Sequence, residues 1–305
     1  MYSLTRRWIC STASSTRDSG RRRPDMKNHK SGVIAGAVLI LVLVMTVAAP
    51  LLTPSPPNQQ DLTAGLLPPF TAGHLLGTDE LGRDVLSRLI YGGRPILLIA
   101  FVSTTAALIV GVIAGLAAGF LGRGADMVIM RIADIQLSVP PIALAVLLAA
   151  SMGPGVKSAM VAIPLVTWPQ IARVVRADVM RVSSSDFVAL ARVAGLSQFT
   201  IARRHVVPNV STVVVVVGTL NLGVAVIYSA AMSFLGLGVQ APRADWGNML
   251  AGGTQYLESW WLVVFPGAML TLVVLCVTLV GDALRDRLDP RHTTSNRTVD
   301  TPAGA

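Results

Sequence analysis

Residue types that perform catalysis are sparse in this chain and lack the spacing that catalysis requires. The sequence contains no HExxH metal-protease motif and no GxSxG nucleophile motif. It also lacks the phosphate-binding loop of ATPases, because Val156 precedes Lys157 and Ser158 where that loop needs a glycine. Cys10 and Cys276 have no partner at metal-binding spacing. We therefore predict that this chain is no enzyme, with no catalytic residue, no metal site and no cofactor of its own.

Basic and apolar residues between 173 and 208 predict another kind of chemistry, the docking of a partner. The stretch from Asp186 to Pro208, DFVALARVAGLSQFTIARRHVVP, has helical spacing on both sides of a glycine. Gly195 suits the left-handed backbone that ends a helix, and Ser197 suits the N-cap of the next one. We expect Pro208 to end that second helix. The stretch therefore predicts a helix, a turn and a second helix.

A short helical hairpin of this kind can bind as a rigid knob in the groove of a partner protein. Phe187, Leu190 and Ile201 would supply its apolar anchors, and the surrounding arginines would steer the approach. From these residues alone, a basic loop bound to anionic lipid headgroups explains the pattern equally well. The hairpin is thus the candidate functional site, with two interpretations open.

The composition places this hairpin in a membrane protein. Of the 305 residues, 52% are hydrophobic and only 13% are charged, and the mean hydropathy is +0.62. Soluble domains have roughly 25% charged residues. The net charge of +9 comes from loops between apolar runs, without interleaved aromatic residues, so we expect no nucleic-acid partner. The predicted fold class is an all-α integral membrane protein.

Apolar runs of about 20 residues, the length that crosses a bilayer, recur along the chain. The first follows Arg and Lys residues as a signal peptide would. Its length and the position of Pro50 after the small residues favour a retained anchor. No Asp or Glu lies at mid-span depth, which argues against a proton- or ion-driven transporter. We expect six transmembrane helices, at 33–52, 96–120, 131–150, 156–171, 210–237 and 260–280.

Small residues and prolines predict how two of these helices pack and bend. Gly111, Gly115 and Gly119 are four residues apart and form one ridge on which another helix can pack closely. Pro140 and Pro141 interrupt the third span and predict a kink.

Charged residues near the predicted membrane surfaces have structural interpretations. Arg131 and Asp134 lie close on one face of the third span and predict an ion pair rather than a proton relay. Before the second span, apolar and charged residues separate onto two helical faces. This pattern fits an interfacial helix and a solvated loop helix equally well. The apolar face holds Leu81, Val85, Leu86 and Leu89, and the charged face holds Asp79, Glu80, Arg83, Asp84 and Arg88.

The loop charges predict an orientation. With six spans, the N-terminal tail, the loop near Arg123, the 173–208 loop and the C-terminal tail share one side and hold most of the positive charge. The positive-inside rule places that side, with both termini, in the cytoplasm. The 53–95 loop is an exception, since it contains three arginines. The predicted organisation is a disordered cytoplasmic tail (1–30), a first transmembrane helix (31–53), an extracytoplasmic loop with an interfacial helix (54–95), a five-helix core containing the cytoplasmic loop 173–208 (96–280) and a cytoplasmic tail (281–305).

The hairpin resembles the EAA loop of the permease subunits of ABC importers. Ala189-Leu190-Ala191 occupies the signature triplet, followed by Gly195, His205 and Pro208-Asn209. The acidic first residue and small second residue of the triplet are replaced, so we expect no Glu-mediated contact here. Further blocks are similar to the branch that imports dipeptides, oligopeptides and nickel, and together they cover nearly everything from His74 to Arg291. They are LGTDELGRDVLSRLIYGGR, MRIADIQLSVPPIALA, SFLGLGVQAPRADWGNML and GDALRDRLDPR.

This resemblance implies a type I ABC importer permease fold, with a peripheral first helix and a five-helix core. It implies a bacterial cytoplasmic membrane protein that moves short peptides, or a related small solute such as nickel or glutathione, into the cytoplasm. The implied partners are a homologous second permease, two cytoplasmic ATPase subunits that bind the ATP, an extracytoplasmic substrate-binding protein and the lipid bilayer. The alternative function is an ATP-independent channel or secondary transporter. The residues expected to couple to the ATPase are Phe187, Ala189, Leu190, Ala191, Arg192, Gly195, Ile201, His205 and Pro208.

Overall fold

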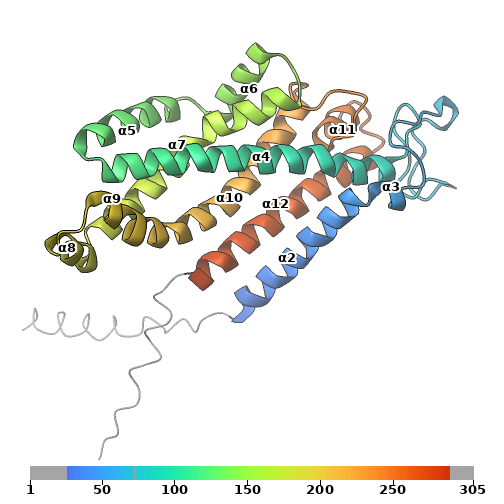
Figure 1. Ribbon diagram of the computed structural model, residues 1–305. Helices are drawn as coiled ribbons and strands as arrows, with labels where there is room; N and C mark the ends of the chain where they lie inside the picture. The colour runs from blue at the N-terminus through green and yellow to red at the C-terminus, as the bar shows by residue number, and fades with distance from the viewer. Residues whose placement is uncertain (1–25, 72, 289–305) are drawn as a thin grey trace, which may run out of the picture.

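A computed structural model describes residues 26–71 and 73–288 of the chain, which form a bundle of helices (Figure 1). Within these residues there is no β-strand, only two isolated β-bridges in the loop before α4. The all-α fold is therefore confirmed. The predicted tails were 1–30 and 281–305. Their residues 1–25 and 289–305 lie outside the described residues, whereas 26–30 belong to a helix and not to a disordered tail, and 281–288 belong to the last helix. The helices are α2 (Met26–Val47), α3 (Ala49–Leu52), η1 (Leu62–Ala64), α4 (Val85–Phe120), α5 (Arg123–Leu137), α6 (Pro141–Met152), α7 (Val156–Ser183), α8 (Asp186–Val193), α9 (Gln198–Ile201), the π-helical turn η2 (Ala202–Val206), α10 (Val207–Phe234), α11 (Trp246–Gly253) and α12 (Trp261–Leu288).

Four continuous helices of the described chain are long and apolar enough to cross a membrane: α4, α7, the run Gln198–Phe234 and α12. The pair α5–α6 gives a fifth crossing if its two arms, which are bent by 87°, form one span. The apolar part of α2, Ser31–Val47, is shorter than these spans. The expectation of membrane-spanning helices is confirmed, with the first predicted span represented by this shorter helix.

Helix α4 joins two segments that the sequence analysis separated. Its 36 residues run from Val85 through the predicted second span, so the expected interfacial helix is the first part of the same helix. The Asp84 carboxylate accepts a hydrogen bond from the Ser87 amide at 2.8 Å and caps its start. Pro95 lies inside α4 without ending it. The predicted boundary at 95–96 is therefore wrong.

The charged face predicted for this region is buried, because its charges are paired with one another. Arg83 Nε lies 2.6 Å from Asp79 Oδ2, and Arg88 Nε lies 3.4 Å from the same oxygen. The Arg88 guanidinium also donates to the Pro57 carbonyl at 3.1 Å. Buried charges are tolerated where opposite charges and hydrogen bonds surround them. The expectation of an interfacial or solvated polar face is wrong, and the cluster instead fixes the loop onto α4.

The glycine ridge of α4 packs against α7, as predicted. A Cβ atom at Gly115 would lie 2.7 Å from Val175 Cβ, and one at Gly119 would lie 2.6 Å from Val179 Cγ1. Such close backbone approach needs glycine. Because Val175 and Val179 fill this interface, α7 continues to Ser183 instead of ending near residue 171.

Helix α5 lies across the same part of α7 and is held there by polar contacts (Figure 1). Asp134 pairs with Arg173 of α7, so the predicted pair between Asp134 and Arg131 is wrong. Asp126 also accepts from Arg176, with Nη2 and Oδ2 2.6 Å apart. These two ion pairs fix α5 to the part of α7 that was predicted to be a loop.

The side chain of Gln136 makes further polar contacts between α5 and α7. Pro169 has no amide hydrogen, so the Leu165 carbonyl four residues earlier in α7 lacks its helical donor. The Gln136 side-chain amide donates to that carbonyl, and Trp168 Nε1 donates to Gln136 Oε1 at 3.1 Å. The end of α5 is thereby fixed to the proline break of α7. Beyond it, the chain turns sharply at Pro140, as the paired prolines predict.

Two further helices close the bundle. Trp246 of α11 is fully buried, and its indole donates to the Leu89 carbonyl of α4 at 2.7 Å. Helix α12 runs to Leu288, beyond the predicted end at Val280. It packs along α2, where Gly32 contacts Ala283 (Figure 1). The start of α2 and the end of α12 therefore lie side by side.

Candidate functional site

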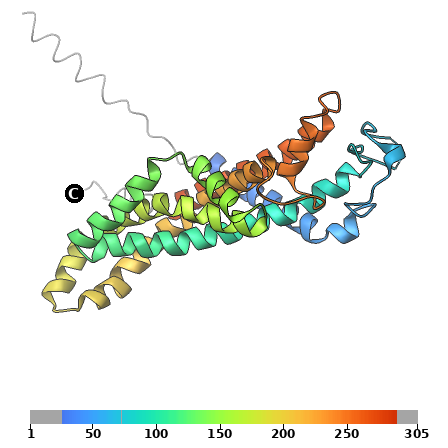
Figure 2. The same cartoon turned by 90° about the horizontal axis from the view of Figure 1, so that it is seen from above.

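The candidate site is the hairpin formed by α8 and α9, which connects α7 to α10. Figures 1 and 2 show it at one end of the molecule, with the loop between α3 and α4 at the opposite end. Asp186 lies in the first turn of α8 and Arg192 in the last turn, where each charge complements the helix dipole. The predicted helix, turn and helix are all present.

The turn of the hairpin closes by two backbone hydrogen bonds that depend on Gly195. Its φ of +78° lies in the left-handed region, as predicted. The Gly195 amide donates to the Arg192 carbonyl at 3.0 Å, and the Leu196 amide donates to the Ala191 carbonyl at 3.1 Å. This is the Schellman arrangement, which satisfies carbonyls at a helix end. The predicted N-cap is also confirmed, since Ser197 Oγ accepts from the Thr200 amide at 3.3 Å.

One face of the hairpin is buried within the chain and fixes its position. Val188 and Ile201 are fully buried and belong to one apolar cluster with Val182, Val206 and others. The expectation that Ile201 is an apolar anchor for a partner is therefore wrong. Periodicity places a residue on the apolar face of a helix without telling whether that face packs inside the chain. Ala191 is also buried, with 8% exposure.

The opposite face is exposed and apolar. Leu190 is 68% exposed and Phe187 45% exposed, so both predicted anchors are accessible in this chain. Sequence analysis missed Val193 and Phe199, which are 87% and 76% exposed. Their signal was available, since each is a large apolar residue beside the predicted turn. Exposed apolar residues gathered on one projecting element are typical of interaction sites.

The second arm of the hairpin continues into α10 through a π-helical turn. Pro208 lies in the first turn of α10 and does not end the helix, so that prediction is wrong. The proline ring would crowd the carbonyl four residues earlier in a regular helix. Here the Val207 amide bonds the Ala202 carbonyl, which widens the helix just before the proline. The Asn209 side-chain amide donates to the His205 carbonyl at 2.6 Å and stabilises the same turn.

His205 and Phe187 connect the two arms of the hairpin. Their ring centroids are 6.1 Å apart, and the ring planes are inclined by 48°. The aromatic contact ties the start of α8 to the π-helical turn.

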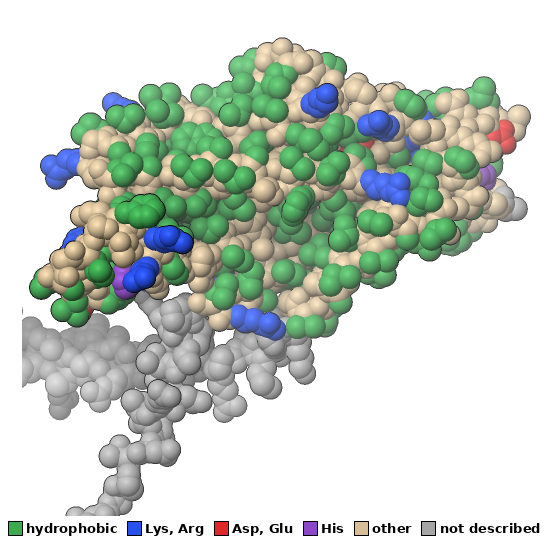
Figure 3. Space-filling view, in the orientation of Figure 1, with side chains coloured by type: hydrophobic (Ala, Val, Ile, Leu, Met, Phe, Trp, Pro, Cys, Tyr) green, Lys and Arg blue, Asp and Glu red, His purple; other side chains and the backbone are tan. Residues whose placement is uncertain are grey.

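Some arginines of this region form ion pairs within the chain, and others are exposed. Arg173 and Arg176 hold α5, and Arg181 pairs with Asp178, with Nη2 and Oδ1 2.6 Å apart. Arg192 and the Arg203-Arg204 pair are exposed on the hairpin itself. Figure 3 shows basic side chains at this end of the molecule and others farther along it, among hydrophobic side chains. The hairpin region thus combines exposed apolar side chains with exposed arginines.

Comparison with known proteins identifies the family of the chain. The family described as "Binding-protein-dependent transport system inner membrane component" matches residues 107–294, and the family described as "N-terminal TM domain of oligopeptide transport permease C" matches residues 23–69. The chain is 42% identical to the di/tripeptide transport system permease protein DppC of Pseudomonas aeruginosa, over 86% of this chain and 89% of that protein. It is 39% identical to the dipeptide transport system permease protein DppC of Alkalihalophilus pseudofirmus, over 87% and 88%.

Solved structures share the fold at lower identity. The MetNI methionine ABC transporter in an inward-facing conformation matches with a TM-score of 0.57 and 20% identity, over 67% of this chain and 97% of the matched chain. An amino acid ABC transporter matches with a TM-score of 0.54 and 15% identity, over 66% and 94%. The fold is therefore that of type I ABC importer permeases. With a family match over most of its length and relatives aligned nearly end to end, the chain belongs to the inner-membrane components of binding-protein-dependent transport systems, the non-catalytic permease subunits of ATP-driven importers.

Proposed function

We propose that this permease moves short peptides into the cytoplasm and that the α8–α9 hairpin is the site at which an ATPase partner docks. Importers of this family work with an ATPase and a binding protein. The peptide substrate is supported by the relatives, whose names specify dipeptide or di/tripeptide transport. The observation that carries the docking site is the exposed apolar face of a hairpin whose other face is locked into the chain.

The geometry explains how docking can drive transport. Burying Leu190, Val193 and Phe199 in a partner's groove would stabilise the complex by about 1.5–3 kcal/mol for each side chain. Because Val188 and Ile201 are packed in the core, a force on the hairpin would displace it together with α7 and α10 and not separately from them. Closure of the ATPase against the hairpin would then displace the helices that line the path.

The remaining features of the assembly follow from this docking. The hairpin faces the cytoplasm, and the adjoining start of α2 and end of α12 lie on the same side of the membrane. A second, homologous permease completes the path, and each permease engages one of two ATPase subunits. The exposed arginines at the hairpin, Arg192, Arg203 and Arg204, support this orientation through the positive-inside rule.

Uptake by reconstituted vesicles tests the function. The complete complex is expected to accumulate a labelled dipeptide when ATP and the binding protein are supplied, and accumulation should stop when the ATPase subunits are omitted. Uptake that persists without them would support the ATP-independent channel or secondary transporter. Transport of nickel or glutathione, with no transport of peptides, would refute the proposed peptide substrate but not the proposed docking site.

A further inference from the structure

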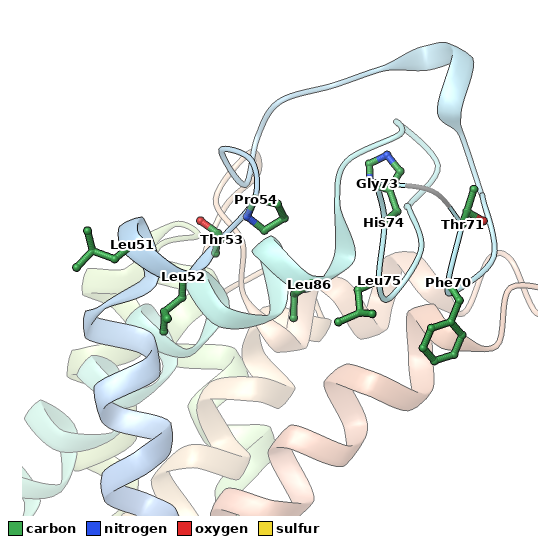
Figure 4. A pocket seen from close by; sticks show the side chains of 10 residues that line it. All are labelled: Leu51, Leu52, Thr53, Pro54, Phe70, Thr71, Gly73, His74, Leu75 and Leu86. Carbon is green, nitrogen blue, oxygen red and sulfur yellow. The ribbon is translucent and has the colours of Figure 1, made fainter.

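A cavity of about 540 Å³ opens at the end of the molecule opposite the hairpin, between α3, the loop that follows η1 and the first turn of α4 (Figure 4). Its lining includes the apolar side chains Leu52, Phe70, Leu75 and Leu86. The ATPase docking site and this cavity lie at opposite ends of the bundle, so the proposed function leaves the cavity unused.

Apolar and polar side chains lie on different sides of the cavity. Figure 4 shows Leu52, Leu86, Leu75 and Phe70 in a row facing the helical body, with the His74 ring on the other side of the cavity. His74 is held there by Asp84, whose carboxylate lies 3.0 Å from Nδ1. Apolar groups toward the spans and polar groups away from them match the boundary between hydrocarbon and headgroups in a bilayer.

Phe70 is held outward by an unusual backbone. Its φ is +67°, and Leu66 is the other non-glycine residue with positive φ in the described chain. The Phe70 amide donates to the Leu75 carbonyl at 3.1 Å, whereas the Phe70 side chain is 81% exposed and packs little inside the chain. Strained residues that persist in a fold point to a functional contact.

The surface next to the cavity is the exposed apolar face of α2, which includes Leu41, Val44 and Val47. Arg94 closes the end of α2 by donating to the Thr46 and Val47 carbonyls at 2.6 and 2.8 Å. Beyond this point Leu51, 87% exposed, continues the exposed apolar face of α2 toward Phe70. The cavity thus continues the exposed apolar face of the first membrane helix, a surface that faces lipid.

We propose that this cavity binds a phospholipid of the leaflet at its end of the membrane. An acyl chain lies along Leu52, Leu75 and Phe70, and the polar headgroup region lies near His74 and Thr71. The bound lipid fills the cavity beside α3 and fixes the loop against the bilayer.

Tryptophan fluorescence in reconstituted vesicles tests the site. Phe70→Trp should add emission that phospholipids with brominated acyl chains quench and that iodide in the water does not. Leu62→Trp is the matched control, because Leu62 is 75% exposed on the same loop and lies outside the cavity lining. Its added emission should respond to iodide and not to the brominated lipid. Iodide quenching of the Phe70→Trp emission, or equal lipid quenching of both variants, would overturn the proposal.

A second measurement identifies the occupant. Native mass spectrometry of the purified complex should show a retained phospholipid that the double variant Phe70→Ser, Leu75→Ser loses and Leu62→Ser keeps. These side chains are exposed, so the variants should fold normally. Equal phospholipid retention in all three proteins would contradict the proposal. Shielding of the Phe70→Trp emission by purified binding protein in lipid-free micelles would show that a protein is the occupant.

Discussion

Replacing Gly195 by valine should uncouple this transporter without unfolding its membrane helices. The φ of Gly195 is +78°, a conformation that costs an L-residue about 1–2 kcal/mol. No heavy atom lies within 4 Å of a Cβ placed there, so backbone strain is the whole penalty and no side chain is displaced. A loss of this size raises the population of the open turn by a factor of about 5–30.

The strain acts directly on the bonds that close the hairpin. The Gly195 and Leu196 amides donate to carbonyls of α8, so their hydrogen exchange should accelerate by about the same factor. Gly195→Val should lower ATP-driven uptake and reduce the stimulation of ATP hydrolysis by the permease. Gly195→Asn should lose much less, since asparagine tolerates the left-handed region.

A matched glycine distinguishes local strain from general damage. Gly122, between α4 and α5, also has a positive φ, +97°, and open space around its Cα. Gly122→Val carries at least as much strain, because φ +97° with ψ −178° is a conformation essentially restricted to glycine, and it should leave the exchange of the hairpin amides unchanged. Wild-type uptake and wild-type amide exchange in Gly195→Val would refute the role given to the turn.

Three further predictions, which use four substitutions, concern folding and docking. Ile201→Ala removes a fully buried side chain and should lower the free energy of unfolding by about 2–5 kcal/mol. Leu190→Ser, at an exposed site, should change the free energy of unfolding by less than about 0.5 kcal/mol and still abolish ATP-driven uptake. Equal unfolding curves for the two variants would contradict the assignment of Ile201 to folding and Leu190 to docking. Gly115→Val should force α4 away from α7, because a Cβ there already lies 2.7 Å from Val175 Cβ, and an unchanged Tm in detergent would argue against the ridge. Burial raises the pKa of Asp245 from its ordinary 3.8 to about 6, so the folded state holds the proton more tightly than the unfolded state. The contribution of Asp245 to the free energy of unfolding should therefore be largest below about pH 4 and fall by at most about 3 kcal/mol as the pH rises to about 6. In a series of unfolding curves, the difference in free energy of unfolding between the wild type and Asp245→Asn, which keeps an N-cap oxygen, should change with pH by that amount.

Local chemistry made the turn of the hairpin predictable from sequence. A left-handed helix end requires glycine, and a serine two residues later caps the next helix, so Gly195 and Ser197 identify the turn without any distant contact. The ridge on α4 is predictable for a similar reason, since small residues four apart share one helical face.

Features that depend on distant partners were not predictable. The side chain of Asp79 looked like part of a polar surface, yet it is buried because Arg83 and Arg88 neutralise it. Helix α7 extends to Ser183 because its valines pack against α4, and loop composition could not show that contact. The burial of Ile201 was not predictable for the same reason, since the helical period places this residue on an apolar face and only the fold shows that this face is buried.

Cross-linking from the exposed face of the hairpin tests the central claim most directly. A photo-reactive amino acid is placed at Leu190 in the assembled complex and, as a control, at Leu257, which is 80% exposed on the loop between α11 and α12. We expect the ATPase subunit to be cross-linked from position 190 and not from position 257. An ATPase that cross-links from position 257, with no product from position 190, would contradict the assignment of the hairpin as the docking site.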